Sequence, residues 1–493
     1  MRRERAAAKP PSIAVLPLRN FTSEPVREAW CDGVSEEITD ALIQVPGLRV
    51  ATRTSAFRFR HENDLRAIGK SLGVATLIDG SVQGGQHGLR AVVQWIRTSD
   101  GNHVWSSTLD ADPGEADPAF ALRVAQSVVA GLQRHLLDHG SPTQQSAIAR
   151  SARRSTSDIA DERYHSARYL MRAQTADGYA RAIEPLRAAI AADPEFALAR
   201  SALAHALVNL VGLTLAPPAT LLADARSELA RALEIDPRLG EAHALDGFIA
   251  HAFDHDWPRA EHAFLRGIRF APSLCYAHSA YAWALMMNGR FEDADSEYRY
   301  ARSLEPLDLK MRAHHALVAL YAGDDDRALA ELSSLAAIEP GNVIVAALLA
   351  TTHLWRGSLD DARAAFEKLA RDHPAITIGE VGLAQIDALE GRTKEARRRL
   401  SALKGDERRY LPPYQAAMIH ARLDEHADAI DWLERSSHAL DMNFVCAPVD
   451  RTFTGLHDDP NFVAMLERNG LRAVWKARGR RPRDPGAQGI HTN

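Results

Sequence analysis

The pattern of hydrophobic positions divides the chain into two regions. Up to about residue 137, short apolar runs alternate with helical patterns. Residues 13–18 form an apolar run broken by Pro17, which is typical of a buried strand. Between residues 32 and 45 apolar side chains recur at a helical spacing, and Pro46 and Gly47 end that pattern.

The hydrophobic pattern continues over the rest of this region. It predicts a strand over 48–51, a helix over 64–72, strands over 76–82, 89–96 and 103–109, and a helix over 117–137. The glycine-rich segment 84–88 joins two of these strands as a hairpin loop rather than a phosphate-binding loop, because a strand follows it and no nucleotide-binding pattern is present. Strands mixed with helices predict a small α/β (α+β) layer domain over 12–137.

After residue 160 the hydrophobic pattern predicts helices throughout, and the same residue types recur at a regular spacing. Proline recurs at 194, 237, 272, 306, 340 and 374, and the last three spacings are 34 residues each. Twelve positions before each proline lies an alanine: Ala182, Ala225, Ala260, Ala294, Ala328 and Ala362. Eight positions before it lies a larger residue: Leu186, Leu229, Phe264, Tyr298, Leu332 and Phe366. Small residues let paired helices approach, and large ones fill the space between stacked hairpins.

This period and these positions resemble the tetratricopeptide repeat. Gly289, Gly323 and Gly357 fall at the turn inside each repeat, where a helix ends. Two degenerate repeats follow, and we expect about eight repeats over 161–440, forming an all-α superhelical solenoid. The wider first spacing predicts that residues 213–220, with Pro217 and Pro218, loop out between helices.

The remaining segments are assigned by composition. Residues 1–11 are expected to be a disordered start, 138–160 a linker, 441–472 a C-terminal capping segment and 473–493 a disordered basic tail. Contact of that tail with nucleic acid or an acidic partner is the alternative to a solvated tail.

Overall composition is that of a globular protein. The chain has 493 residues, 46% of them hydrophobic and 25% charged, with a formal net charge of −5. This balance gives no general case for nucleic-acid binding, although it is compatible with a local basic patch. Cys31, Cys275 and Cys446 are far apart, so neither a disulfide framework nor a structural metal site is expected. There is no apolar run of membrane-spanning length and no secretory signal, which predicts a cytoplasmic protein.

The first region resembles the TolB-like amino-terminal domain of bacterial regulators. The stretches that carry the resemblance are 13–17, 32–38, 46–50, 53–55, 68–74, 79–82 and 98–106, and residues 456–462 resemble the closing segment of the same proteins. In that family a winged-helix DNA-binding domain or an adenylate or guanylate cyclase domain usually precedes this unit. Only eleven residues stand before the first strand here. The resemblance therefore implies regulation, sensing or scaffolding, and not DNA binding or cyclase activity.

The candidate partner site is the concave groove of the repeats. In tetratricopeptide proteins the first helix of each repeat lines this groove, which by repeat position includes Phe248, His251, Trp283, Met286, Met287, Leu320, Tyr321, Leu354 and Trp355. Large apolar side chains from consecutive repeats, with adaptable methionines, suit a bound peptide or helix. The alternative is that several of them belong to the core between helices. Lys310 and His314 alone are too little to predict the clamp that binds chaperone tails.

A second candidate is an anion site at Arg53, Thr54 and Ser55, followed by the basic and aromatic segment 57–61. Hydroxyls and cations just after a strand can hold an anion, and the alternative is a solvated loop. The histidine and aspartate groups at 251–256, 314–315 and 324–326 lack convergent metal-binding geometry, and no nucleophile motif is present. We expect no metal, no cofactor and no enzymatic activity.

These observations favour a non-catalytic scaffold or signal-transduction component that binds a protein or peptide in the repeat groove. The alternative is a transcription-regulatory or cyclase-associated sensor module that lacks its own output domain. The sequence leaves the oligomeric state open.

Overall fold

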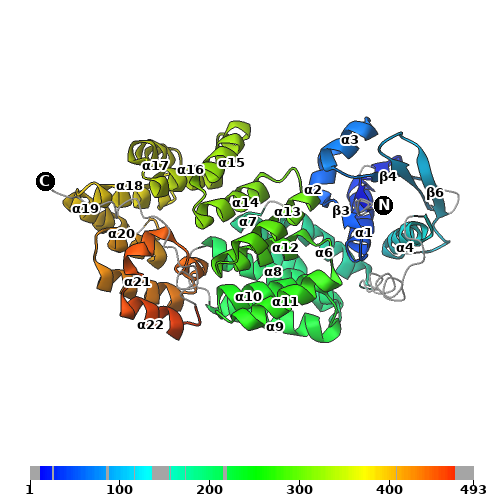
Figure 1. Ribbon diagram of the computed structural model, residues 1–493. Coiled ribbons are helices and arrows are strands. Elements are labelled where there is room, and N and C mark those ends of the chain that lie inside the picture. Colours follow the sequence, from blue (N-terminus) through cyan, green and yellow to red (C-terminus); the bar gives the residue numbers. More distant parts are fainter. Residues whose placement is uncertain are drawn as a thin grey trace, which may run out of the picture.

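The computed structural model describes residues 11–24, 27–84, 88–115, 117–135, 155, 157–171, 174–214, 219–406 and 408–471. It contains a small sheet domain followed by a long array of paired helices (Figure 1). The predicted disordered ends, most of the 138–160 linker and the tip of the 84–88 loop lie outside these residues.

The amino-terminal domain is built on a mixed sheet. Its strands are β1 (Ser12–Val15), β2 (Arg19–Asn20), β3 (Arg49–Val50), β4 (Thr76–Gly84), β5 (Leu89–Arg97) and β6 (His103–Asp110). They are ordered β3-β1-β4-β5-β6, with β2 also pairing with β4. Strands β1, β3 and β4 run parallel, and the antiparallel pair β4–β5 confirms the predicted hairpin.

Helices cover both faces of this sheet. The domain's helices are α1 (Arg27–Ile43), α2 (Arg53–Ala56), the 3₁₀ turn η1 (Phe57–Phe59), α3 (Leu65–Leu72) and α4 (Asp117–His135). Helices α1 and α4 bury Val34, Ile38 and Val128 against one face. On the other face α3 packs Ile68 and Leu72 against Leu16 and Leu77. Asp64 caps α3 by accepting hydrogen bonds from two backbone N–H groups, which is why the helix begins there.

Eight helical hairpins follow in the described part of the chain. They are α6 (Asp158–Met171) with α7 (Ala176–Ala192), α8 (Ala197–Thr214) with α9 (Ala219–Ile235), α10 (Gly240–Ala252) with α11 (Trp257–Phe270), α12 (Cys275–Met287) with α13 (Phe291–Leu304), α14 (Leu309–Ala322) with α15 (Asp325–Ile338), α16 (Val343–Arg356) with α17 (Leu359–Asp372), α18 (Ile378–Leu389) with α19 (Thr393–Lys404), and α20 (Pro413–Arg422) with α21 (His426–His438).

Packing follows the predicted repeat register. The six alanines twelve positions before the prolines are all fully buried, and the six larger residues eight positions before the prolines are buried as well. Gly323 and Gly357 end α14 and α16 with a φ of 88° each, a backbone conformation that favours glycine. The small residues thus lie where paired helices approach, as the sequence pattern predicts.

The wider first spacing between prolines falls on the second hairpin. Residues 213–220 were expected to loop out; α8 extends to Thr214 and α9 begins at Ala219, and residues 215–218 lie outside the described part of the chain. Much of the additional length therefore lengthens two helices, because continuing the helix satisfies backbone hydrogen bonds that a loop would leave to water.

The end of the chain turns back along the repeats. The two 3₁₀ segments η2 (Met442–Cys446) and η3 (Arg451–Leu456) precede the short helix α22 (Pro460–Arg468). Figure 1 shows this orange and red region beside the green helix α10, far from it in sequence. Phe444, Phe453 and Phe462 of this segment are fully buried in the same core as α10 and α12. The last repeat and this segment thus close the solenoid against its own middle.

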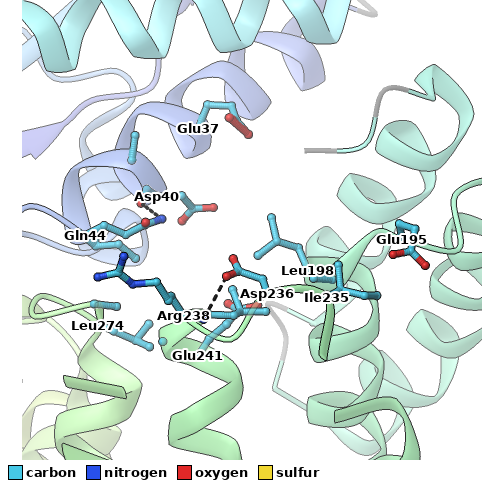
Figure 2. A pocket seen from close by; sticks show the side chains of 16 residues that line it. Glu37, Asp40, Gln44, Glu195, Leu198, Ile235, Asp236, Arg238, Glu241 and Leu274 are labelled. Atoms are coloured by element: carbon cyan, nitrogen blue, oxygen red, sulfur yellow. Dashed lines mark hydrogen bonds between the residues drawn. The ribbon is translucent and has the colours of Figure 1, made fainter. Parts of the chain in front are cut away.

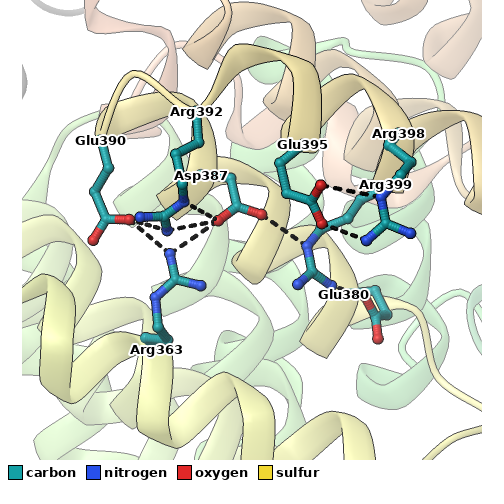
Figure 3. A network of polar contacts seen from close by, with 8 residues as sticks. All are labelled: Arg363, Glu380, Asp387, Glu390, Arg392, Glu395, Arg398 and Arg399. Atoms are coloured by element: carbon teal, nitrogen blue, oxygen red, sulfur yellow. Dashed lines mark hydrogen bonds and ion pairs between the residues drawn. The ribbon is translucent and has the colours of Figure 1, made fainter.

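An ion network holds the junction between the sixth and seventh repeats. Asp387 of α18 is almost fully buried, and its carboxylate accepts hydrogen bonds from Arg363 (3.0 Å), Arg392 (2.7 Å) and Arg399 (2.8 Å) (Figure 3). The guanidinium groups come from α17, from the turn after α18 and from α19. A buried carboxylate needs such partners, since an unpaired one would carry a large desolvation cost.

No helix in the described part of the chain is both long enough and apolar enough to span a bilayer.

Candidate binding site

The nine predicted groove residues all lie on the first helices of their repeats. They come from α10, α12, α14 and α16. Six of them are buried, namely His251, Met286, Met287, Leu320, Leu354 and Trp355. Phe248, Trp283 and Tyr321 remain partly exposed. Binding of a partner to any of these residues stays a prediction, and in this conformation the six buried side chains contact the chain itself.

The chain's own C-terminal segment covers this end of the groove. Arg451 of η3 donates hydrogen bonds to the Asp325 carboxylate at 2.5 Å and to the Trp355 carbonyl at 2.6 Å. Its guanidinium lies 5.5 Å from the centre of the Trp355 ring. Tyr414 donates a hydrogen bond to buried Asp450 at 2.8 Å. Residues 441–471, called the closing segment below, therefore occupy the surface where the sequence placed part of a partner site.

One part of the inner surface stays open. A stripe of partly exposed side chains runs along α12 and α14, at positions three to four residues apart: Tyr276, Ser279, Trp283, His314, Leu317 and Tyr321. This set is called the open strip. Most of its members are apolar or aromatic, and they come from two consecutive repeats. The open strip thus keeps the character that the sequence predicted for a groove.

The inner surface is narrow at its amino-terminal end. The His205 ring of α8 lies 5.0 Å from the Tyr276 ring of α12, although a whole repeat separates these helices. His205 also lies 6.3 Å from Tyr179 at the start of α7. Burial lowers the pKa of His205 to about 4, so this ring is uncharged at neutral pH.

The sheet domain docks on the loops between repeats through its edge strand β3. Parallel pairing with β1 uses the N–H groups of Arg49 and Ala51, which leaves the Val50 N–H pointing away from the sheet. Ser273, in the turn before α12, accepts a hydrogen bond from that N–H at 3.3 Å and donates one to the Leu48 carbonyl at 2.7 Å. An exposed strand edge invites unwanted pairing, and here the solenoid covers it.

This docking forms a cavity of about 560 Å³, open to solvent on one side, between α1, α2 and the inner surface of the first repeats. Tyr276, the first residue of the open strip, lines it, so the cavity and the strip are continuous. Domain interfaces are common positions for ligand sites of this size.

The structure separates the three residues of the predicted anion site. They form the short helix α2, and Arg53 and Thr54 line the cavity. Ser55 is buried and lies outside the cavity lining. Arg53 pairs with Glu36 of α1, with 2.6 Å between Nη1 and Oε1. Anion binding at these residues stays a prediction. The alternative considered from the sequence was a solvated loop, and the structure has a short helix at this position instead.

Carboxylates on α1 and α10 approach one another near this interface. Asp40 has a pKa raised to about 7, because burial disfavours its charge more than Arg168 stabilises it, and Glu36 and Glu241 repel it. Burial also raises the pKa of Glu241. Figure 2 shows Glu37, Asp40 and Gln44 facing Asp236, Arg238 and Glu241 across a second, smaller cavity of about 110 Å³.

The aspartates of the groups at 251–256 and 324–326 have structural partners. Asp254 pairs with Arg226 and with Arg259, and Asp256 and Asp324 cap α11 and α15. A different group brings ligand atoms together, namely His420, Glu425 and Asp428. There the His420 ring faces the Lys404 amine at 3.2 Å and Glu425 pairs with Arg397. Lys404 and Arg397 thus already contact two of these three residues.

Comparison with known proteins identifies repeats of a known family in part of the chain. The tetratricopeptide repeat family model matches residues 319–378. Among curated proteins, the putative adenylate cyclase 3 of Rhizobium meliloti is 36% identical over 101 residues, which cover 20% of this chain and 17% of that protein. The chain thus matches only about a sixth of the length of that relative.

Several solved structures of repeat proteins are similar at low identity. The yeast Tom70 structure is 13% identical, with a TM-score of 0.40, over 71% of this chain and 82% of that one. The Pseudomonas aeruginosa pilF structure is 18% identical, with a TM-score of 0.30, over 38% of this chain and 86% of that one.

Tetratricopeptide repeats are present in this chain, as the sequence predicted. Proteins built from these repeats generally mediate protein–protein interactions and are typically non-catalytic scaffolds.

The cavity between the two parts of the chain could not be predicted from the sequence. Its lining joins Arg58 of η1 with Arg168 of α6, Tyr179 and His205 of the first repeats, and Tyr276 of the fourth. The basic and aromatic segment 57–61 was the one visible signal. The other residues converge only because the sheet domain docks on the repeats.

Proposed function

We propose that this chain is a non-catalytic regulatory scaffold that binds a peptide or protein partner on the open strip inside its repeats. The observation that supports this most is the strip itself. Trp283, Leu317 and Tyr321 present apolar and aromatic surface from consecutive repeats that the closing segment leaves partly exposed. Such side chains at helical spacing serve as anchor pockets for a bound peptide or amphipathic helix.

The proposal narrows the predicted groove. The partner would contact Trp283 and Tyr321 and their neighbours Leu317 and Tyr276, and not the six residues that the chain itself buries. A large aromatic residue in a narrow, partly desolvated groove is the usual form of a binding hot spot. We include in the proposal a TolB-like identity for the sheet domain and a cytoplasmic location.

A matched pair of variants tests this function. Leu317→Glu places a charge inside the open strip, whereas Leu265→Glu places the same charge on the outer helix α11, where Leu265 is 51% exposed. The two variants and the unmodified protein would serve as baits in lysate of the source organism, after circular dichroism and thermal unfolding have shown that all three are equally folded.

We expect a partner that binds the unmodified protein and the Leu265→Glu variant but not the Leu317→Glu variant. A buried charge without a counter-ion disfavours docking of an apolar segment. Equal capture by all three proteins would contradict binding on the open strip.

A second candidate function is a sensor module of a cyclase-type signalling protein. The similarity over 101 residues to the putative adenylate cyclase 3 supports this alternative. A nucleotide cyclase or a DNA-binding regulator among the captured proteins would favour it over a general scaffold.

A further inference from the structure

The cavity between the sheet domain and the repeats has the size and position of a small-molecule site. Its volume of about 560 Å³ lies within the range of ligand pockets, and both parts of the chain contribute to its walls. The charged and aromatic side chains of these walls determine which class of ligand the cavity can bind.

One wall carries a cation with unused hydrogen-bond donors. Arg58 is exposed at the cavity, and the described residues give it no hydrogen bond or ion pair. Arg53 lines the cavity as well, but one of its nitrogens pairs with Glu36 and the other, Nη2, is buried, so Arg58 is the cation that a ligand can reach. A planar guanidinium presents its donors in a fork that matches a carboxylate.

The acidic groups of the cavity do not cancel this cation. Glu36 pairs with Arg53 and lies 3.7 Å from Arg168. Glu305 accepts a weak hydrogen bond from the Cys275 thiol at 3.6 Å, and burial raises the pKa of this carboxyl. Glu36 is therefore paired, and burial disfavours the charge of Glu305 and of Asp40, whereas arginine keeps its charge at every physiological pH.

The opposite wall is aromatic. Tyr179, His205 and Tyr276 line the cavity and lie within 5.0 to 6.3 Å of one another between neighbouring ring centres. Because the imidazole is uncharged at neutral pH, these rings form a neutral aromatic surface, with neighbouring rings tilted by 54° and 43°. Aromatic rings prefer offset-stacked or edge-to-face contacts with other rings, which a planar ligand can supply.

We propose that this cavity binds a small organic carboxylate with a planar aromatic body. The carboxylate would accept hydrogen bonds from Arg58, and the ring would lie against Tyr276 and His205. A ligand held by both walls would also stabilise the docking of the sheet domain on the repeats. This inference does not depend on the proposed protein partner.

The test uses the full-length protein and two probes of the same shape and opposite charge. Binding of 4-fluorobenzoate and of 4-fluorobenzamidine would be titrated by ¹⁹F nuclear magnetic resonance. We expect saturable binding of the benzoate only. Inorganic phosphate would serve as competitor, and we expect it to leave the benzoate bound, because phosphate offers no ring for the aromatic wall.

Variants locate the site. Arg58→Gln removes the free cation, and loss of one charge-assisted hydrogen bond should weaken benzoate binding by at least about tenfold. The control is Arg269→Gln, since Arg269 is an exposed arginine of α11 for which the described residues give no ion pair, and it has no place in the cavity. We expect this control to bind as the unmodified protein does. A Tyr276→Leu variant should also bind more weakly, because it removes the stacking surface.

Four outcomes would overturn the proposal. They are absence of benzoate binding, equal binding of the benzamidine, unchanged affinity in both the Arg58→Gln and Tyr276→Leu variants, and full displacement of the benzoate by phosphate, which would show that charge alone is recognised.

Discussion

The Ser273 hydroxyl is one of the groups through which the repeats cap the open edge of the sheet, beside the Leu304 carbonyl that accepts a hydrogen bond from the Thr52 N–H, and replacing Ser273 with alanine should loosen that docking. The side chain is 1% exposed and joins two backbone groups of the sheet domain, the Val50 N–H and the Leu48 carbonyl. Alanine fits the same space but can neither accept nor donate. The variant therefore leaves two buried polar groups without this partner.

The magnitude follows from the two bonds. The donated bond is short, at 2.7 Å, and its loss costs about 1–3 kcal/mol, whereas the accepted bond is long, at 3.3 Å, and contributes about 1 kcal/mol or less. Together they give about 1–4 kcal/mol. Since 1.4 kcal/mol corresponds to tenfold in an equilibrium constant, local opening of β3 should become at least about fivefold more frequent.

Hydrogen–deuterium exchange measured by mass spectrometry gives the readout, in peptides that contain residues 48–52. We expect Ser273→Ala to accelerate exchange there and to leave the distant helices α18 and α19 unchanged. Ser279→Ala is the matched control, because the Ser279 hydroxyl bonds only to the Tyr276 carbonyl in its own helix, at 3.1 Å. Exchange over 48–52 that is equal in the two variants would refute the reasoning.

The remaining predictions concern stability and are read from urea unfolding of the full chain. Asp387→Ala should cost about 3–5 kcal/mol, because three guanidinium groups lose a buried partner, and wild-type stability would contradict that. Arg451→Ala should cost about 2–4 kcal/mol by releasing the closing segment, and an unchanged midpoint would count against its role. Ala294→Leu and Ala328→Leu should each cost about 1–3 kcal/mol, because neither site has exposed surface, and no loss in both would mean that the repeat register is wrong. Burial raises the pKa of Asp40 to about 7 from a usual 3.8, which contributes stability that is fully present below about pH 4 and is lost as the pH rises through 7. Asp40→Asn should flatten that decline in the free energy of unfolding. An identical pH profile of this free energy in the variant and the unmodified protein would contradict the prediction.

The repeat architecture could be predicted from the sequence because it is a local property. Ala294 and Ala328 recur at the same place in each repeat, and each repeat packs mainly on its neighbours. The same holds for the β4–β5 hairpin and for the helix that Asp64 caps. In these cases neighbouring residues suffice to determine the structure.

The closing segment and the cavity depend on contacts between distant residues. Nothing near Arg451 indicates that its partners are Asp325 and the Trp355 carbonyl, more than ninety residues away. Arg53 was likewise predicted to bind an anion, whereas the fold places the carboxylate of Glu36 beside it. Pairing of this kind follows from the curvature of the solenoid and from domain docking, which a repeat pattern does not encode.

Photo-crosslinking inside the cells from which the protein comes tests the central claim most directly, because it reports where a partner lies without requiring a stable complex. The photoreactive residue 4-benzoylphenylalanine would replace Leu317 on the open strip in one protein and Leu265 on the outer face of α11 in another. The account predicts a covalent adduct with one specific protein from position 317 and none from position 265. Adducts from position 265 alone, or the same adducts from both positions, would contradict a partner site inside the repeats.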